Sequence, residues 1–199
     1  MKETAKRLKS VQEYYFSRKL REVEKRISEG QPIINMGIGS PDLPAHSSVL
    51  EALQNALTNS NVHMYQSYRG LPELRKGISE FYKTHYQVVL DPNTEVLPLM
   101  GSKEGIMHIS MAFLNPGDQV LIPNPGYPTY ASVSRLLETK PIFYSLSEVT
   151  NWQPDFKELE SLDTSKIKIM WVNYPHMPSG TDFDVDTLQR LIRWAKKND

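Results

Sequence analysis

The sequence predicts an α/β protein with a mainly parallel sheet flanked by helices. Two observations lead to this prediction. From residue 95 onward, short apolar segments alternate with helical ones, and the turns after several strands are rich in glycine and proline. Strands separated by helices are typical of βαβ units, in which the strands run parallel. Such sheets bind ligands beyond the carboxyl ends of their strands, so we expect functional residues in the loops there.

Helical periodicity dominates the first half of the chain, where glycine and proline mark the ends of the helical segments. A glycine- and proline-rich segment at 33–45 is predicted to be irregular. The helix after it has Ser47 or Ser48 as its expected cap. Three helices are expected in this half. The first covers residues 11–29, the second runs from its cap at Ser47 or Ser48 to Leu57, and the third runs from Pro72 to about Tyr86.

The second half alternates between the two periodicities. Four strands are expected, at residues 95–99, 119–122, 141–145 and 168–172. Four helices are expected between and after them, at residues 102–114, 127–138, 156–162 and 185–197.

Composition excludes several classes of protein. The chain has 199 residues and no cysteine, which excludes disulfides, thiolate zinc sites and cysteine nucleophiles. Its 23 basic and 23 acidic side chains balance, which argues against non-specific binding to nucleic acid. No stretch approaches the roughly 18 apolar residues of a membrane span. We therefore expect a cytoplasmic protein that binds neither nucleic acid nor a membrane, and we expect no metal site.

The turn at Gly101–Gly105 joins a predicted strand to a predicted helix. Backbone N–H groups at a helix N-terminus favour an anion, and Ser102 and Lys103 would add a hydroxyl and a cation. The simpler alternative is an ordinary helix start with Ser102 as the N-cap. Both interpretations stay open on these residues alone.

Three further loops are candidates for a binding site. Three prolines and a glycine make 123–130 a rigid loop that presents Tyr127, either to stack on a planar ligand or to pack into the core. Prolines also frame the loop at 173–180, where we expect His176 to be solvent-exposed. The glycines of 36–44 suggest a close approach of the backbone to another group.

Together these loops resemble a known family. The order and spacing of five segments, GIGSPDLP, Tyr65 followed by GLPELR, GSKEG, NPGYPTY and NYPHMPSG, is similar to that of the class I and II aminotransferases. These are pyridoxal-5′-phosphate enzymes of fold type I, and the likeness is to the branch of diaminopimelate, alanine and aspartate aminotransferases. It covers the chain from about residue 33 to its end. It implies an N-terminal helix and arm over 1–45 and an incomplete large domain, its N-terminal half, over 46–199.

The resemblance assigns roles to single residues. Ser102 and Lys103 match positions that hold the cofactor phosphate, and Tyr127 matches the aromatic ring that stacks on the pyridine. Tyr65 matches a tyrosine that reaches the phosphate of the partner subunit, which implies a homodimer with shared active sites.

Substrate contacts are implied in the same way. Gly39, with Ile38 beside it, matches the backbone near the substrate α-carboxylate. Tyr14 or Tyr15, of which we favour Tyr15, matches an N-terminal tyrosine on the substrate side.

One position departs from the family pattern. The family has Asn-Pro-Thr-Gly where this chain has Met177-Pro178-Ser179-Gly180, and the asparagine donates a hydrogen bond to the phenolic oxygen of the cofactor. The Met177 side chain has no N–H donor, and Asn173 is not the matching position. We expect the change to alter activity without abolishing binding.

The resemblance also implies that three reactive groups lie beyond Asp199, in a C-terminal half and a small domain. They are the lysine that forms the Schiff base, the acid that pairs with the pyridine nitrogen, and the arginine that binds the substrate carboxylate. We expect the complete protein to transfer an amino group from an amino acid to a 2-oxo acid. The 199-residue chain is expected to be inactive alone.

Two alternatives remain. Another fold-type-I enzyme, such as a carbon–sulfur lyase or a decarboxylase, would share these loops, and so would a non-catalytic sensor domain. A further expectation concerns the strand at 95–99. In the strand order of the family it has no neighbour among the other predicted strands, so an ordered structure would need rearranged pairing or a second chain.

Overall fold

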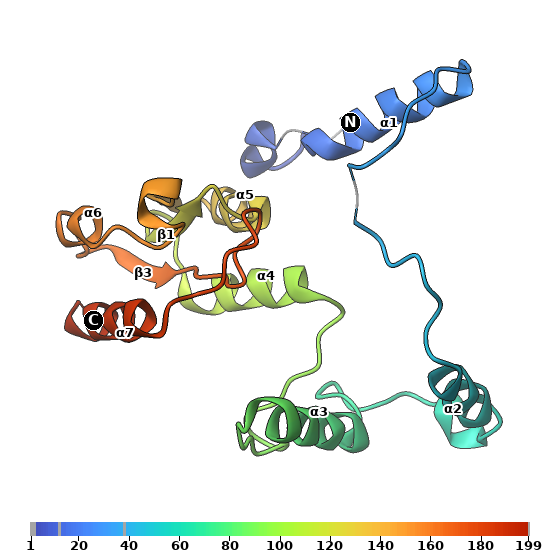
Figure 1. The fold of residues 1–199 in the computed structure, drawn as a ribbon. Helices are drawn as coiled ribbons and strands as arrows, with labels where there is room; N and C mark the ends of the chain where they lie inside the picture. Colours follow the sequence, from blue (N-terminus) through green and yellow to red (C-terminus); the bar gives the residue numbers. More distant parts are fainter. Residues whose placement is uncertain (1–2, 12, 38, 199) are drawn as a thin grey trace. The chain divides into compact units, whose positions relative to one another are not determined.

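The computed structural model describes residues 3–11, 13–37 and 39–198, and it divides into two compact units. The sheet unit comprises residues 3–11 and 99–198. The helical unit comprises the described residues of 13–98. Figure 1 labels the helices and strands of both units.

Three parallel strands form the sheet, as the alternating pattern predicts. They are β1 (Gln119–Asn124), β2 (Lys140–Ser145) and β3 (Ile167–Met170), in the order β2-β1-β3. The central strand pairs in register with β2 from Gln119–Lys140 to Asn124–Ser145. Its pairing with β3 has an irregularity, because the register shifts between Gln119 and Val120. The first strand in the chain is therefore the central one, and the carboxyl ends of all three point the same way.

The prediction of a strand at 95–99 is wrong, because these residues form an irregular segment. Proline at position 98 has no N–H to contribute to a ladder, and no strand of the described sheet pairs with this segment. The Leu97 side chain is largely exposed. An apolar segment becomes a strand only where its backbone groups find partners, which the sequence pattern does not report.

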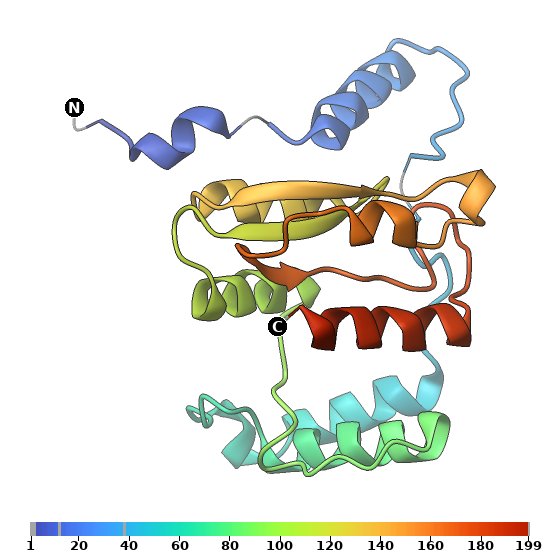
Figure 2. The ribbon, with the colours of Figure 1, turned by 90° about the vertical axis from the view of Figure 1, so that its left-hand side faces the viewer.

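Helices cover both faces of the sheet (Figures 1 and 2). Because side chains of a strand alternate between faces, β1 contributes Val120 and Ile122 to one buried cluster and Leu121 to the other. The first cluster includes residues of α4 and α5, and the second includes residues of α6 and α7. These helices are α4 (Ser102–Phe113), α5 (Pro128–Leu136), α6 (Phe156–Glu160) and α7 (Val185–Lys197), with short 3₁₀ turns at η1 (Lys6–Ser10) and η3 (Glu148–Thr150).

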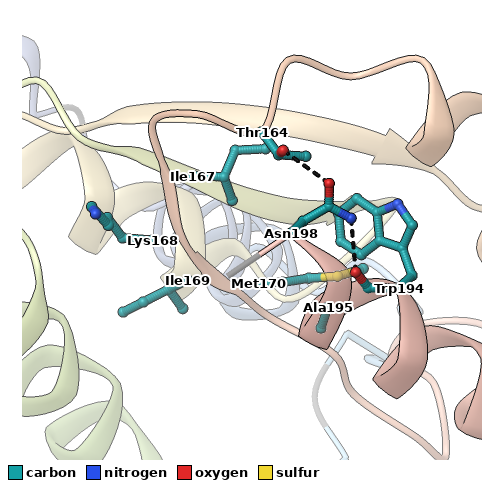
Figure 3. A pocket seen from close by; sticks show the side chains of 8 residues that line it. All are labelled: Thr164, Ile167, Lys168, Ile169, Met170, Trp194, Ala195 and Asn198. Carbon is teal, nitrogen blue, oxygen red and sulfur yellow. Dashed lines mark hydrogen bonds between the residues drawn. The ribbon is translucent and has the colours of Figure 1, made fainter.

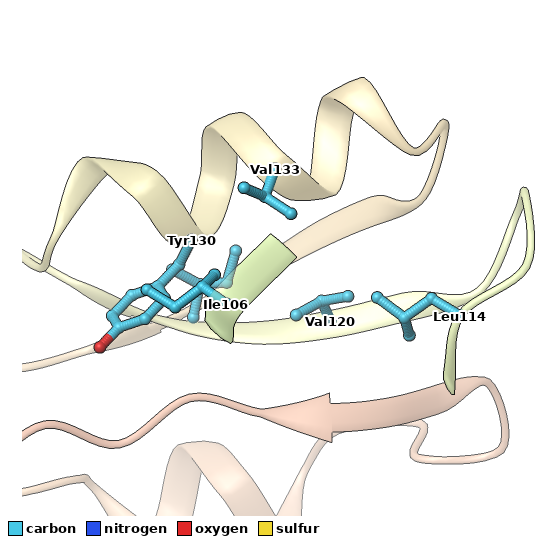
Figure 4. Close-up of a cluster of buried hydrophobic side chains, with 6 residues drawn as sticks. Ile106, Leu114, Val120, Tyr130 and Val133 are labelled. Atoms are coloured by element: carbon cyan, nitrogen blue, oxygen red, sulfur yellow. The ribbon is translucent and has the colours of Figure 1, made fainter. Parts of the chain in front are cut away.

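Figure 4 shows the α4–α5 cluster, which joins Ile106 of α4, β1, and Tyr130 and Val133 of α5. Burying a side chain of this size contributes roughly 1.5–3 kcal/mol relative to leaving it in water. The α6–α7 cluster contains Tyr144 and Leu159, which are 1% and 0% exposed. The two clusters hold α4 and α5 to one side of the sheet and α6 and α7 to the other.

The helical unit contains α1 (Tyr15–Ser28), α2 (Ser47–Leu57), η2 (Ser60–His63) and α3 (Pro72–Tyr86). Helix α3 has the predicted limits, with proline in its first turn, where a missing N–H costs nothing. Helix α1 begins at Tyr15 rather than at residue 11. The cap of α2 is His46 instead of Ser47 or Ser48, because the ring Nδ1 of His46 accepts the Ser48 N–H at 3.3 Å.

Arg75 is the one buried residue among the described residues of the helical unit. Its guanidinium donates to three backbone carbonyl oxygens, those of Pro92 at 2.9 Å, Arg69 at 3.2 Å and Gly70 at 2.6 Å. These bonds replace the water that a buried cation would lose. They join the turn before α3 to the segment that follows the helix. Among the described helices, none is both long and apolar enough to cross a bilayer.

Candidate functional site

Two proline-framed loops follow the parallel strands β1 and β3, and they leave the sheet at the same edge. The loop after β1 runs through 124–127, and the loop after β3 runs through 171–181. The structure joins them through His176, whose ring Nε2 lies 3.1 Å from the Pro125 carbonyl oxygen. The segment that carries Tyr127 and the segment that carries Met177 therefore meet, as expected for ligand-binding loops of a parallel sheet.

The first turn of α4 has the form of an anion-binding turn. Gly101 is the N-cap residue, with φ +104°, a backbone conformation that residues with a side chain seldom adopt. Ser102 is the first residue of the helix and not its cap, so the simpler alternative for this residue is wrong. No side chain caps this end of α4, and both Ser102 and Lys103 are exposed. The positive end of the helix dipole is thus open to a ligand.

Glu104 is the one acidic residue in that turn, and both of its carboxylate oxygens lie near groups of the chain. One oxygen accepts the backbone N–H of Met100, and the other lies 3.9 Å from the His108 ring nitrogen one turn along. The bond to Met100 holds the carboxylate against the segment that leads into the helix. The exposed Ser102 hydroxyl and the backbone N–H groups of the first turn lie at the tip.

Tyr127 is half-buried, and its ring joins an aromatic stack. It meets Tyr130 edge to face at a centroid distance of 5.7 Å, and Tyr130 lies parallel to Trp171 at 4.9 Å. Burial, together with the nearby Tyr127, raises the pKa of Tyr130, so that hydroxyl stays protonated at neutral pH. Tyr127 packs against the α4–α5 cluster, in agreement with the interpretation that it packs into the core, while its stacking on a planar ligand stays a prediction.

His176 is 2% exposed, so the expectation of a solvent-exposed histidine is wrong. The reason lies in its contacts, since its two ring nitrogens face Pro125 and Ser179. The neighbouring Tyr174 donates its hydroxyl to the Trp152 carbonyl oxygen at 2.7 Å, and burial raises the pKa of Tyr174 to about 12. Ser179 is three residues from His176, but Pro125 and Trp152 are remote from this loop in sequence, so only the fold brings those two to it.

Met177 has a 54% exposed side chain, and its backbone N–H donates to the Asn173 side-chain oxygen at 3.3 Å. The Asn173 amide thus lies beside Met177 although it is four residues away. Its oxygen is engaged by the backbone, which leaves the amide N–H₂ as the donor of this pair.

Four predicted site residues belong to the helical unit, and the structure describes three of them. Tyr65 is fully exposed and Tyr15 is 56% exposed, with the Arg18 guanidinium 5.7 Å from its ring centre. A Cβ added to Gly39 would meet no atom within 4 Å, so there is open space where a side chain would stand. Ile38 lies outside the described residues.

A separate pocket of about 190 Å³ lies beside β3 and the end of α7 (Figure 3). Thr164 donates to the Asn198 side chain at 3.1 Å across its rim. None of the predicted site residues lines it. Within the described residues, no group of three or more His, Asp or Glu side chains could hold a metal ion. The pocket is lined by Thr164, Ile167, Lys168, Ile169, Met170, Trp194, Ala195 and Asn198.

Comparison with known proteins identifies the family. The family model for aminotransferase class I and II matches residues 31–199. The chain belongs to this family. This result confirms the resemblance seen in the sequence, and neighbours of fold type I confirm the parallel α/β architecture.

Individual relatives agree with this assignment. The chain is 40% identical over 197 residues to LL-diaminopimelate aminotransferase from Aquifex aeolicus, covering 99% of this chain and 51% of that protein. The solved structure of apo-BacF from Bacillus subtilis is similar at 35% identity and a TM-score of 0.91, covering 100% of this chain and 51% of that one. An alanine aminotransferase from Pyrococcus furiosus is similar at 30% identity and a TM-score of 0.90, covering 98% of this chain and 50% of that one. The chain spans about half the length of the relatives it matches.

Proposed function

We propose that the complete protein is an aminotransferase that moves an amino group from an amino acid to a 2-oxo acid with pyridoxal 5′-phosphate as cofactor. Membership of the family supports amino-group transfer. The structural observation that carries the proposal is the first turn of α4, which begins at a left-handed glycine, lacks a side-chain cap and presents a hydroxyl and an ammonium.

The residues of the sheet unit fit the chemistry of this cofactor. A phosphate suits the N-terminus of α4, where backbone dipoles favour an anion and Ser102 and Lys103 add polar donors. A pyridine ring suits Tyr127, a half-buried aromatic residue on a loop that is bonded to the loop after β3. When bound, the cofactor supplies an electron sink for bonds at the substrate α-carbon.

In this proposal the chain's own residues bind the cofactor and orient its ring. Ser102 and Lys103 hold the phosphate, and Tyr127 limits tilting of the ring. The Met177 side chain cannot donate to the phenolic oxygen. The Asn173 amide, beside Met177, is the donor in this loop that we expect to compensate in part.

The remaining roles rest on the resemblance. In this proposal residues 1–45 are an arm and residues 46–199 are the first half of the large domain. Tyr65 reaches the cofactor phosphate of the partner subunit in a cytoplasmic homodimer. Gly39, Ile38 and Tyr15 lie on the substrate side. Proton transfer belongs to a lysine outside this chain, so the 199-residue chain alone has no turnover.

Phosphate binding is tested directly with the 199-residue chain. Pyridoxine 5′-phosphate lacks the aldehyde and cannot react with surface lysines, and pyridoxine lacks the phosphate as well. We expect the phosphorylated compound to bind more tightly by calorimetry. Lys103→Ala and Ser102→Ala should each weaken that binding by about tenfold, the value of one charge-assisted hydrogen bond. Lys157→Ala, a surface lysine of α6, is the control. Equal affinity of both compounds, or equal loss in the control, would refute the assignment.

The reaction itself is tested on the complete protein. A screen begins with the amino acids named for the relatives, LL-diaminopimelate and alanine, each paired with a 2-oxo acid. Amino transfer supports the proposal. Release of a sulfur product or of carbon dioxide instead would assign the protein to another fold-type-I chemistry, and no turnover with retained cofactor binding would favour a sensor.

A further inference from the structure

His176 lies at the meeting point of the two loops of the candidate site. Its side chain is 2% exposed, and both ring nitrogens have partners, Nδ1 with Ser179 Oγ at 2.7 Å and Nε2 with the Pro125 carbonyl oxygen at 3.1 Å. Its backbone is also fixed, since its N–H donates to the Thr181 carbonyl at 2.7 Å and its own carbonyl accepts the Gly180 N–H at 2.6 Å. A histidine with four such bonds is rigidly placed.

The partners determine where the ring hydrogen lies. A proline carbonyl can only accept, so Nε2 carries a hydrogen and donates it to Pro125. In the neutral ring Nδ1 then accepts the hydroxyl hydrogen of Ser179. The Ser179 oxygen is 3.2 Å from Thr181 Oγ1 and receives the Thr181 N–H at 3.4 Å. One tautomer therefore satisfies every polar atom of the ring, and a buried polar ring needs this.

A second segment holds the same loop from another side. The Trp152 ring lies nearly parallel to the His176 ring at 6.3 Å, and the Trp152 carbonyl accepts the Tyr174 hydroxyl. The next residue, Gln153, donates its side-chain amide to the Asp182 carbonyl at 3.0 Å. Asn151 and Trp152 both have positive φ, of 50° and 57°. Such a conformation costs free energy and persists where surrounding contacts impose it.

The bond from His176 controls Tyr127 because the chain between them has little freedom. Pro125 has a fixed φ, and a Cβ on Gly126 would lie 2.5 Å from the Pro123 carbonyl oxygen, so the backbone folds tightly on itself there. A movement of the Pro125 carbonyl must therefore appear at Tyr127, two residues on. The Tyr127 ring in turn contacts the Tyr130 ring edge to face.

We propose that His176 is a positioning residue, which through its Nε2–H fixes the Pro125 carbonyl and so sets the orientation of the Tyr127 ring relative to the Met177 loop. The consequence for cofactor affinity rests on the proposed function. The positioning itself does not, because it is a property of the ligand-free chain.

The test uses two substitutions that separate the ring nitrogens. Glutamine places an amide N–H₂ near the Nε2 position, whereas asparagine reaches only the Nδ1 position. The chain is labelled with 3-fluorotyrosine, and the Tyr127 fluorine resonance is assigned by its loss in Tyr127→Phe. We expect His176→Asn to shift or broaden this resonance and His176→Gln to leave it close to that of the unsubstituted chain. His63→Asn, on η2, is the control.

Folding is monitored by the urea midpoint, so that a general loss of structure is recognised. If His176→Asn does not fold, Ser179→Ala keeps the ring and removes its Nδ1 partner, and we expect a smaller change of the same resonance. An unchanged Tyr127 signal in a folded His176→Asn or Ser179→Ala chain would overturn the proposal. So would equal changes in His176→Asn and His176→Gln.

Binding of pyridoxine 5′-phosphate gives a second readout. His176→Asn should weaken it by about fivefold, and this loss should vanish in a Tyr127→Ala background if the histidine acts through Tyr127. Equal losses in both backgrounds contradict the coupling. If the unsubstituted chain does not bind the compound, the proposed function fails, while the fluorine spectra still decide the role of His176.

Discussion

The sheet unit and the helical unit differ in what their apolar side chains face. In the sheet unit, β1 is buried on both faces, and Val120 and Leu121 are 0% exposed. In the helical unit, α1 and α2 contain no buried residue, and leucines such as Leu53 of α2 are more than half exposed. Amphipathic spacing is sufficient to predict a helix, but a core forms only where a second surface covers the apolar face.

The largest expected effect on stability tests this difference between the two units directly. Leu121→Ala removes a fully buried side chain from the centre of the sheet and should lower the free energy of unfolding by about 3 kcal/mol. Leu53→Ala makes the same chemical change on an exposed face and should stay within about 0.5 kcal/mol. Urea unfolding of the 199-residue chain measures both. Comparable losses would show that the face of α2 is covered in solution.

A tight backbone turn in the sheet unit gives the next effect. In Gly126→Ala the new Cβ meets the Pro123 carbonyl oxygen at 2.5 Å, and a backbone atom cannot swing aside as a side chain does. We expect a loss of about 2 kcal/mol by urea unfolding. Gly39→Ala in the helical unit has nothing within 4 Å and no positive φ, so it should be nearly neutral. Tolerance of alanine at 126 would show that the loop opens readily.

The helical unit offers a substitution of opposite sign. Gly77 lies inside α3, and a Cβ there meets nothing within 4 Å. Alanine loses less backbone entropy in a helix, so Gly77→Ala should stabilise α3 by up to about 1 kcal/mol. Slower amide hydrogen exchange in residues 78–86 would show it. Gly70→Ala is the contrasting variant, since Gly70 has φ +79° and a Cβ would lie 2.9 Å from Pro98. Faster exchange in the Gly77 variant would contradict the prediction.

The smallest expected effect is a pH dependence of α7. Asp184 caps this helix by accepting the Thr187 N–H at 2.8 Å, and bonds to Thr187 hold the pKa of the Asp184 carboxyl below its ordinary value of 3.8. A carboxyl with a lower pKa in the folded state stabilises that state above its unfolded pKa, and the contribution is lost as the pH falls through the folded pKa.

Asp184→Asn keeps a capping oxygen but has no proton to gain. Between about pH 4 and pH 2 it should therefore lose less stability than the unsubstituted chain, as measured by thermal unfolding at each pH. Gln189→Asn on the same helix is the control and should lose as much stability between these pH values as the unsubstituted chain. If Asp184→Asn lost as much stability on acidification as the unsubstituted chain, the cap would not respond to pH.

Local patterns in the sequence were enough to predict most elements. The limits of α3 and α7 follow from proline, charge and periodicity within a few residues of each end. The irregular conformation of residues 95–99 was not predictable in this way, because a strand also needs a partner, and the sequence pattern carries no information about one. The cap of α2 was missed because a histidine ring replaces the usual hydroxyl.

The candidate site divides similarly. The helix start at Ser102 and the loop with Tyr127 follow from local glycine and proline patterns, which place both next to helix N-termini. The burial of His176 depends on Pro125 and Trp152, which are distant in the chain, so no local pattern reports it. The roles of all the predicted site residues stay predictions, namely those of Ser102, Lys103, Tyr127, Tyr65, Gly39, Ile38, Met177 and Tyr15.

The strand order has a consequence for synthesis on the ribosome. The N-terminal side of a chain emerges first, so β1 and β2 can pair as soon as both are released. The opposite edge of β1 stays bare until β3 has been made, an interval of seconds at usual rates of translation. A bare edge next to Leu121 and Ile122 is a template for strands of other nascent chains. The strand that becomes the centre of the finished sheet is therefore an edge strand during part of its synthesis.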